Sequence, residues 1–193
     1  CARAGVPEEH RRALTKPDLA LAEIDRVIAA GVRFGRALAD AGYGASAASR
    51  RGLSMRRLAW AVGILKTQTV YPAAVELPWP VAARGRPREH PVPSGAPVAA
   101  EAMLAGAAWR RISWRLGTKG PLAAEFAALR VRPAEGAQLR NGWHLPGDEV
   151  WLVGEHRASG ERKYYLSNLP AEAPPEELAA TIKARWVCEQ AHQ

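Results

Sequence analysis

Proline placement sets the strongest constraint on how this chain folds. Seven prolines fall in one stretch, at positions 72, 78, 80, 87, 91, 93 and 97. Proline lacks the backbone N–H that helices and inner strands need, so no helix or central strand can carry so many. We therefore predict a linker or an extended excursion between residues 72 and 97.

Upstream of the prolines, the hydrophobic pattern alternates between helix and strand. Residues 17–30 carry apolar side chains at helical spacing, and a second, shorter helix is predicted at 45–57. Residues 32–40 alternate as a strand does, while the nearly continuous apolar run 58–65 is typical of an interior strand. Helix, strand, helix, strand predicts an α/β fold.

Asp40 is the first candidate for chemistry. It ends the 32–40 strand, on the side predicted to carry Val32, Phe34 and Leu38, and a Gly-rich turn at 42–44 follows. Taken by itself, Asp40 is explained more simply as a turn aspartate, because Asp is common where strands end.

Downstream of the prolines, the elements are predicted in a different order. A short helix is expected at 98–108 and a strand at 125–132. Residues 149–154 and 163–167 predict a hairpin across Ser159-Gly160. A last helix is expected from residue 174 to the end of the chain, because prolines followed by acids are a helix-start signal.

Glu189 is the second candidate, and it lies on this last helix. Spacings of four, three and four place Leu178, Ile182, Arg185 and Glu189 on one face. The simpler alternative is an exposed Arg185–Glu189 pair one turn apart. Glu189 can meet Asp40 only through tertiary folding, and such a pair of carboxylates would suit a divalent metal.

The charge of the chain favours a polyanionic partner. It has 27 Lys and Arg against 19 Asp and Glu, a formal net charge of +8. A GC-rich genome also produces Arg-rich proteins, so the charge alone leaves both explanations open. Basic residues cluster at 50–57, at 84–88 and at 110–119, and the last cluster is interleaved with the neighbouring Trp109 and with Trp114. Cations with flat rings suit nucleic acid, but a solvated face over core tryptophans explains them equally.

Several classes of protein are disfavoured. The two cysteines lie at opposite ends and the five histidines are scattered, which argues against a zinc site and fits a reducing cytoplasm. No apolar run is long enough to span a membrane. The chain starts without Met or a signal peptide, so we expect it to be cut from a longer protein. Nucleophile-elbow, dinucleotide and P-loop patterns do not occur.

Four motifs in order resemble the catalytic domain of bacterial insertion-sequence transposases of the Asp-Asp-Glu (DDE) superfamily. They are Thr15-Lys16-Pro17-Asp18-Leu19-Ala20, Ala39-Asp40-Ala41-Gly42-Tyr43-Gly44, Tyr164-Tyr165-Leu166-Ser167-Asn168 and Arg185-Trp186-Val187-Cys188-Glu189-Gln190. The resemblance implies a ribonuclease-H-like mixed sheet with flanking helices. It also implies that residues 72–147 form a Pro-rich, β-containing insertion between two parts of the catalytic core, residues 1–71 and 148–193.

The resemblance assigns roles to individual residues. Asp40 would be the second metal-binding carboxylate and Glu189 the third, with Mg²⁺ or Mn²⁺ as the cofactor. Arg185 matches a family arginine near the DNA backbone, whereas Ile182 stands where relatives often have Tyr. The first Asp is expected on a strand upstream of Cys1, and a family Lys beyond Gln193, so the chain is expected to be truncated at both ends.

The function implied is phosphodiester hydrolysis and strand transfer at insertion-sequence ends, by a chain that is inactive alone because the first Asp is missing. The partner is double-stranded DNA, at transposon ends and target, in the bacterial cytoplasm at the nucleoid, and a homo-oligomer is left open. The candidate DNA contacts are Arg185, Lys183, Arg110, Arg111, Arg115 and Lys119. The alternative is a non-catalytic DNA-binding remnant or a regulator of an intact transposase.

Overall fold

The computed structural model describes Gly5, Pro7 and residues 13–80, 89–118 and 120–190, with side chains described as far as Arg185. Five helices lie in this part of the chain: α1 (Lys16–Ala29), α2 (Ala41–Gly44), α3 (Ala47–Met55), α4 (Ala100–Met103) and α5 (Pro175–Gln190). None of these helices is both long enough and apolar enough to cross a membrane.

Nine strands in the same ranges form one mixed sheet. They are β1 (Arg36–Ala39), β2 (Ala59–Ile64), β3 (Thr69–Pro72), β4 (Val98–Ala99), β5 (Arg110–Gly117), β6 (Gly120–Gln138), β7 (His144–Pro146), β8 (Val150–His156) and β9 (Arg162–Ser167). The strand order is β1-β2-β9-β8-β6-β3-β4, and β5 and β7 also pair with β6. Only β1 and β2 among these strands pair in parallel.

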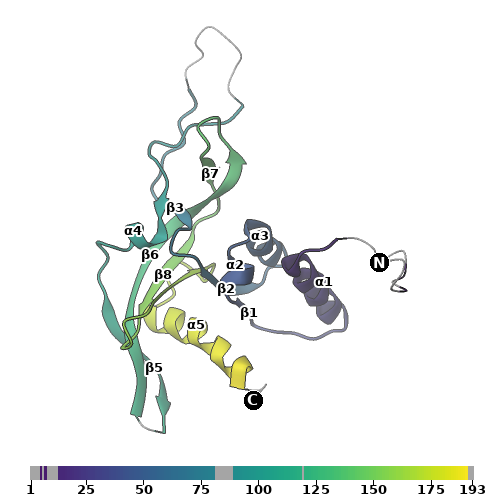
Figure 1. Cartoon of the computed structure of the whole chain (residues 1–193), viewed down its shortest axis with the longest axis vertical. Helices are drawn as coiled ribbons and strands as arrows, with labels where there is room; N and C mark the ends of the chain where they lie inside the picture. Colours follow the sequence, from purple (N-terminus) through teal and green to yellow (C-terminus); the bar gives the residue numbers. More distant parts are fainter. Residues whose placement is uncertain (1–4, 6, 8–12, 81–88, 119, 191–193) are drawn as a thin grey trace.

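Helices cover both faces of the sheet (Figure 1). On one face, Leu53 of α3 and Leu104 beside α4 pack on Val62 and Leu166, and α1 adds the partly buried Ile24. On the other face, Leu178, Ala179 and Ile182 of α5 pack on the sheet and on Ile112 of β5. Each such large side chain, once buried, contributes about 1.5–3 kcal/mol. The predicted α/β class with flanking helices is confirmed, and the mixed sheet is consistent with a ribonuclease-H-like fold.

The start of α1 follows the local sequence closely. Thr15 caps the helix: its side chain accepts a hydrogen bond from the backbone N–H of Asp18, whose carboxylate accepts one from the N–H of Thr15 at 3.0 Å. This reciprocal pair satisfies two backbone donors that the first turn would otherwise leave without helical partners. The predicted helix at 17–30 is confirmed, and it begins and ends one residue earlier than predicted.

Other elements differ from the sequence prediction in length or type. The strand expected at 32–40 begins only at Arg36, because Gly31 takes a positive φ of 82° and Val32 stays 52% exposed. The turn expected at 42–44 is the single helical turn α2. The helix expected at 98–108 shortens to α4, and the strand expected at 125–132 extends to the 19 residues of β6.

The middle segment is part of the same sheet as the two flanking segments. Strand β6, from the segment 72–147, pairs with β8 over Glu125–Val131 against Val150–His156. Residues 73–80 and 89–97 contain no helix or strand, as the prolines require. The division into the three segments 1–71, 72–147 and 148–193 remains a prediction.

Candidate active site

Asp40 stands where β1 gives way to α2. It is the N-cap of α2, and its Oδ1 accepts a hydrogen bond from the backbone N–H of Gly42 at 2.9 Å. Its own carbonyl accepts from the N–H of Gly44 at 2.8 Å. The turn-aspartate interpretation is therefore right as a description of the backbone. The carboxylate is exposed, and an ionised carboxylate has several more acceptor positions than this one bond uses.

Two glycines hold this turn against the sheet. A Cβ on Gly63 of β2 would lie 3.0 Å from the backbone nitrogen of Ala41 and 3.2 Å from the carbonyl carbon of Asp40. A Cβ on Gly44 would lie 2.0 Å from the carbonyl oxygen of Gly63. The backbone of α2 therefore packs directly on β2, which fixes where Asp40 stands.

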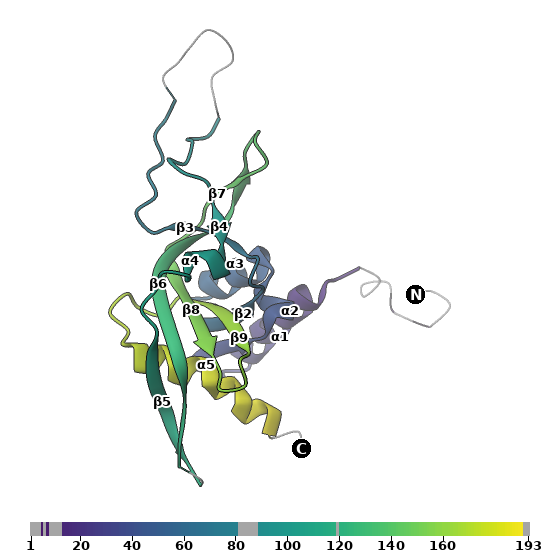
Figure 2. The same cartoon turned by 60° about the vertical axis from the view of Figure 1, so that its left-hand side comes forward.

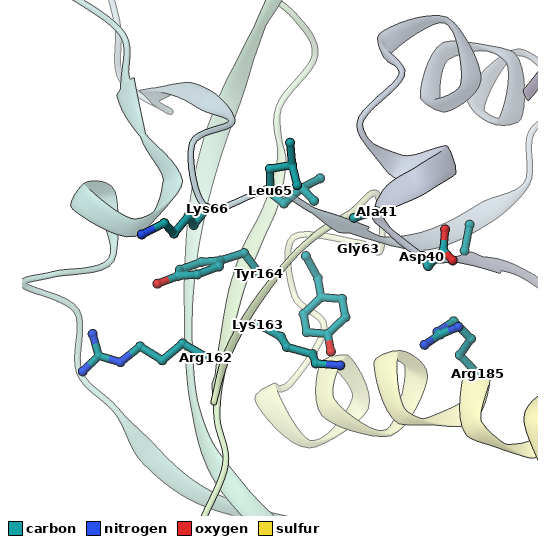
Figure 3. Close-up of a pocket in the computed structure, with 12 residues that line it drawn as sticks. Asp40, Ala41, Gly63, Leu65, Lys66, Arg162, Lys163, Tyr164 and Arg185 are labelled. Carbon is teal, nitrogen blue, oxygen red and sulfur yellow. The ribbon is translucent and has the colours of Figure 1, made fainter. Parts of the chain in front are cut away.

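A hollow of about 370 Å³ opens beside Asp40, between the ends of β1, β2 and β9 and the helix α5 (Figure 3). Its lining includes four cations from three places in the chain: Lys66 after β2, Arg162 and Lys163 on β9, and Arg185 on α5. Asp40 is the one acid among the described lining residues. A cleft lined mainly by one sign of charge concentrates ligands of the other sign, here polyanions.

Arg185 of α5 lines the same hollow as Asp40. In Figure 3 its side chain rises from α5 toward the end of β1, where Asp40 lies. Glu189 lies one turn further along α5, but its side chain is outside the described residues. A meeting of Asp40 with Glu189 remains a prediction. In the part of the chain that the structure describes, no group of three or more His, Cys, Asp or Glu side chains could hold a metal ion.

A second hollow, of about 620 Å³, continues from the first along α5. The two hollows share Lys163, Tyr165 and Arg185. Lys183 of α5 and Arg115 of β5 line the second one, beneath the β5–β6 hairpin that runs past α5 (Figure 2).

The remaining predicted DNA contacts are spread along β5. Arg110 lines a separate hollow near the start of α5, and Arg111 is exposed on the same strand. Lys119 lies outside the described residues. The structure thus gathers Arg115, Lys183 and Arg185, and leaves Arg110 and Arg111 further along the hairpin.

A buried carboxylate lies behind the hollows. Glu155 of β8 is 0% exposed and accepts hydrogen bonds from Lys183 Nζ at 2.7 Å, Arg157 Nε at 2.9 Å and the Tyr165 hydroxyl at 2.8 Å. Burial pushes the pKa of Glu155 upward, but these hydrogen bonds outweigh burial and the pKa lies below its ordinary value. Burial, and then the neighbouring Glu155 carboxylate, raise the pKa of Tyr165.

Sequence reasoning missed the cations that line the first hollow beside Arg185. Lys66, Arg162 and Lys163 belong to no basic cluster in the sequence, and they meet only because β2 and β9 are neighbours. Glu155 did leave a signal: it follows Trp151 and Val153 at strand spacing, which places an acid on a face that otherwise enters the core.

Comparison with known proteins identifies the family of the chain. A search of curated proteins finds no match. The sequence model of the family described as DDE superfamily endonuclease matches residues 1–121, a range that contains Asp40 and the strands β1–β5. Because this match covers more than half of the 193 residues, the chain belongs to the DDE superfamily endonuclease family.

Proposed function

We propose that this chain is the DNA-processing part of an insertion-sequence transposase, which hydrolyses phosphodiester bonds and joins strands at the ends of a mobile element. The observation that carries the proposal is the position of Asp40. It stands at a strand end and lines a hollow together with Lys66, Lys163 and Arg185, which come from three separate places in the chain. One carboxylate among several cations suits a ligand that is a polyanion and reacts beside a metal.

The cofactor we propose is Mg²⁺ or Mn²⁺, held by Asp40 and Glu189. The exposed carboxylate of Asp40 fits, because these hard cations take oxygen ligands. When bound, the metal would supply activation of the attacking water and stabilisation of the leaving oxygen. The backbone N–H of Gly42 holds one carboxylate oxygen of Asp40 in place, so the donor is oriented before any ligand arrives.

The cations would bind and orient the DNA backbone. Arg185 and Lys163 border the hollow that contains Asp40, so a phosphate held between them lies beside the carboxylate. Further phosphates would follow the second hollow and β5, where the proposed contacts are Lys183, Arg115, Arg110, Arg111 and Lys119. Such contacts fix the register of the duplex and carry no sequence information themselves.

Two of the three family carboxylates are assigned to this chain, so we do not expect it to cleave DNA by itself. The second candidate function, a DNA-binding remnant or regulator without catalysis, rests on the same hollow. Four cations and one described acid would suffice to bind DNA without any metal.

The test is duplex binding and nicking by the wild-type chain and by Asp40→Asn. Asn caps a helix as well as Asp does, so this change removes the charge and keeps the turn. Without metal, we expect Asp40→Asn to bind duplex DNA about two- to fivefold more tightly, since an anion beside the phosphate is lost. With Mn²⁺, we expect the wild type to gain affinity and Asp40→Asn to gain none.

Nicking separates the two candidate functions. We expect a version extended upstream through one more strand to nick duplex DNA with Mg²⁺ or Mn²⁺, and Asp40→Asn or Glu189→Gln to abolish the nicking. If the extended protein folds and binds DNA but never nicks it with either metal, the result supports the second candidate function, a DNA-binding remnant or regulator without catalysis. Failure of the wild-type chain to bind duplex DNA at low salt would contradict both functions.

A further inference from the structure

Glu155 is the one acidic side chain that is fully buried in the described part of the chain. Taking an ionised carboxylate out of water costs several kcal/mol, and well-packed apolar residues often serve stability equally well in such a place. A buried carboxylate that keeps its charge therefore invites a reason beyond stability.

The contacts of Glu155 connect three elements. Glu155 lies near the end of β8, Tyr165 lies on the neighbouring β9, and Lys183 lies on α5. Lys183 also stands over the ring of Trp114 of β5, 4.6 Å from its centroid. Lys183 is thus held between a carboxylate and an aromatic ring, which limits rotation and sliding of α5 on the sheet.

Ion pairs extend from this cluster to the first hollow. Arg157 donates from Nη1 to Glu161 Oε2 at 2.8 Å, and Lys163 Nζ lies 3.4 Å from Glu161 Oε1. The resulting series alternates in sign, from Lys183 through Glu155, Arg157 and Glu161 to Lys163. Lys163 lines the hollow beside Asp40, so one end of the series reaches the candidate active site.

The other end reaches the same hollow through α5. Arg185 follows Lys183 by two residues on this helix and also lines the hollow beside Asp40. The position of Arg185 relative to Asp40 therefore depends on where α5 is held. Among the described side-chain hydrogen bonds, Arg36 of β1 donates to Glu177 and Thr181 in the first half of α5, and Glu155 accepts from Lys183 in its later half. These bonds add to the apolar packing of α5 on the sheet.

We propose that Glu155 is a positioning residue of the candidate active site: through Lys183 it fixes the later half of α5, and so places Arg185 beside Asp40 to bind the phosphate at that site. This inference rests on the proposed DNA-binding function. Glu155 itself touches no DNA, because its carboxylate is covered by protein.

The direction in which Glu155→Gln changes DNA affinity separates a positioning role from a purely electrostatic one. Glu155→Gln removes a negative charge beside a basic groove, so electrostatics alone predicts tighter DNA binding. A positioning role predicts the opposite, about three- to tenfold weaker binding of a short duplex. Because the Arg185 phosphate contact is lost, the slope of log K against log salt should also decrease by about one. Glu155→Asp keeps the charge but shortens the reach, and we expect it to weaken binding as well.

A double-mutant cycle with Arg185→Ala tests whether Glu155 affects DNA binding through Arg185. We expect Glu155→Gln to cause no further loss in the Arg185→Ala background, since the same phosphate contact is already gone. The matched control is Glu149→Gln, which breaks an Arg130–Glu149 pair at the other end of β8 and should leave DNA affinity unchanged. Equal or tighter binding by folded Glu155→Gln would overturn the proposal, and so would a loss that simply adds to that of Arg185→Ala.

A measurement without DNA keeps the two proposals separate. The Nε–H resonance of Arg185, followed by NMR, should shift in Glu155→Gln. If that variant does not fold, Glu155→Asp replaces it and should show the same shift. The resonance should keep its wild-type position in Glu149→Gln. If the wild type binds no duplex DNA, the proposed function fails and this resonance alone decides whether Glu155 positions Arg185. An unchanged resonance would refute the positioning role even in a chain that binds DNA.

Discussion

Gly44 of α2 and Gly63 of β2 approach so closely that a Cβ on Gly44 would lie 2.0 Å from the carbonyl oxygen of Gly63. The same Cβ would lie 2.8 Å from the Cβ of Val62. Only a residue without a side chain leaves room for α2 at this distance from β2. Because Asp40 caps α2, this contact between two backbones determines the height of the carboxylate above the sheet.

We predict that Gly44→Ala lowers the free energy of unfolding by about 2 kcal/mol or more, because the obstacle is backbone and cannot swing aside. Urea denaturation measures the change. Gly35→Ala is the matched control: it lies just before β1, has nothing within 4 Å of its Cβ position, and should change stability by less than about 0.5 kcal/mol. Equal stability of the two variants would show that α2 does not pack on β2 as described.

The second prediction concerns the buried pair of Arg50 and Glu135. Arg50 of α3 is 2% exposed, its Nε donates to Glu135 Oε2 of β6 at 3.1 Å, and its Nη1 donates to the carbonyl of Gly44. Arg50→Met leaves Glu135 without this partner in a nearly buried site, which should cost about 3–5 kcal/mol.

Thermal unfolding followed by circular dichroism measures this cost. Arg26→Met on α1 is the control, since Arg26 and its partner Glu23 are both exposed, and we expect no measurable change in Tm. An Arg50→Met variant as stable as the wild type would mean that α3 is not tied to β6 through this pair.

The sequence predicts best where local signals and burial agree. The helix α1 has a cap, a proline in its first turn and one apolar face, and it forms within one residue of its predicted bounds. The strand β2 is nearly continuous in apolar residues and forms in the sheet interior. The hairpin β8–β9 forms around the predicted turn at Ser159-Gly160, where Gly160 takes a positive φ of 84°.

Elements that depend on distant partners escaped prediction. Strand β3 is four residues long and ends in Pro72, and it exists because β6 extends far enough to pair with it. The position of Asp40 at a strand end was predictable, whereas the presence of Lys66 and Arg162 in the same hollow was not. Neither residue belongs to a local sequence pattern. The hollow that they line forms only when β2 and β9 pair.

The third prediction is the pH dependence that Glu155 confers. The pKa of Glu155 in the folded protein lies below its ordinary value of 4.5, so its charged form stabilises the fold above that pH. This stabilisation is lost as pH falls through the folded-state pKa. We therefore expect the stability difference between wild type and Glu155→Gln to be largest near pH 7 and to shrink below about pH 4.

Urea denaturation of both proteins at pH 7, 5 and 3.5 measures this difference. Other carboxylates titrate alike in the two proteins and cancel in the comparison. A difference that stays constant across these pH values would mean that Glu155 is not held as a carboxylate by Lys183, Arg157 and Tyr165.

The last prediction concerns Lys163, which lines both hollows and which no sequence pattern indicated. A lysine that contacts one phosphate releases about one counterion when DNA binds, so Lys163→Ala should reduce the slope of log K against log salt by about 0.9. Fluorescence anisotropy of a labelled duplex, titrated at several salt concentrations, measures the slope. Arg140→Ala removes an exposed cation from the loop between β6 and β7 and should leave the slope unchanged. Equal reductions in the two variants would mean that DNA responds to the net charge of the chain, whereas a loss confined to Lys163→Ala places the phosphate backbone beside Asp40.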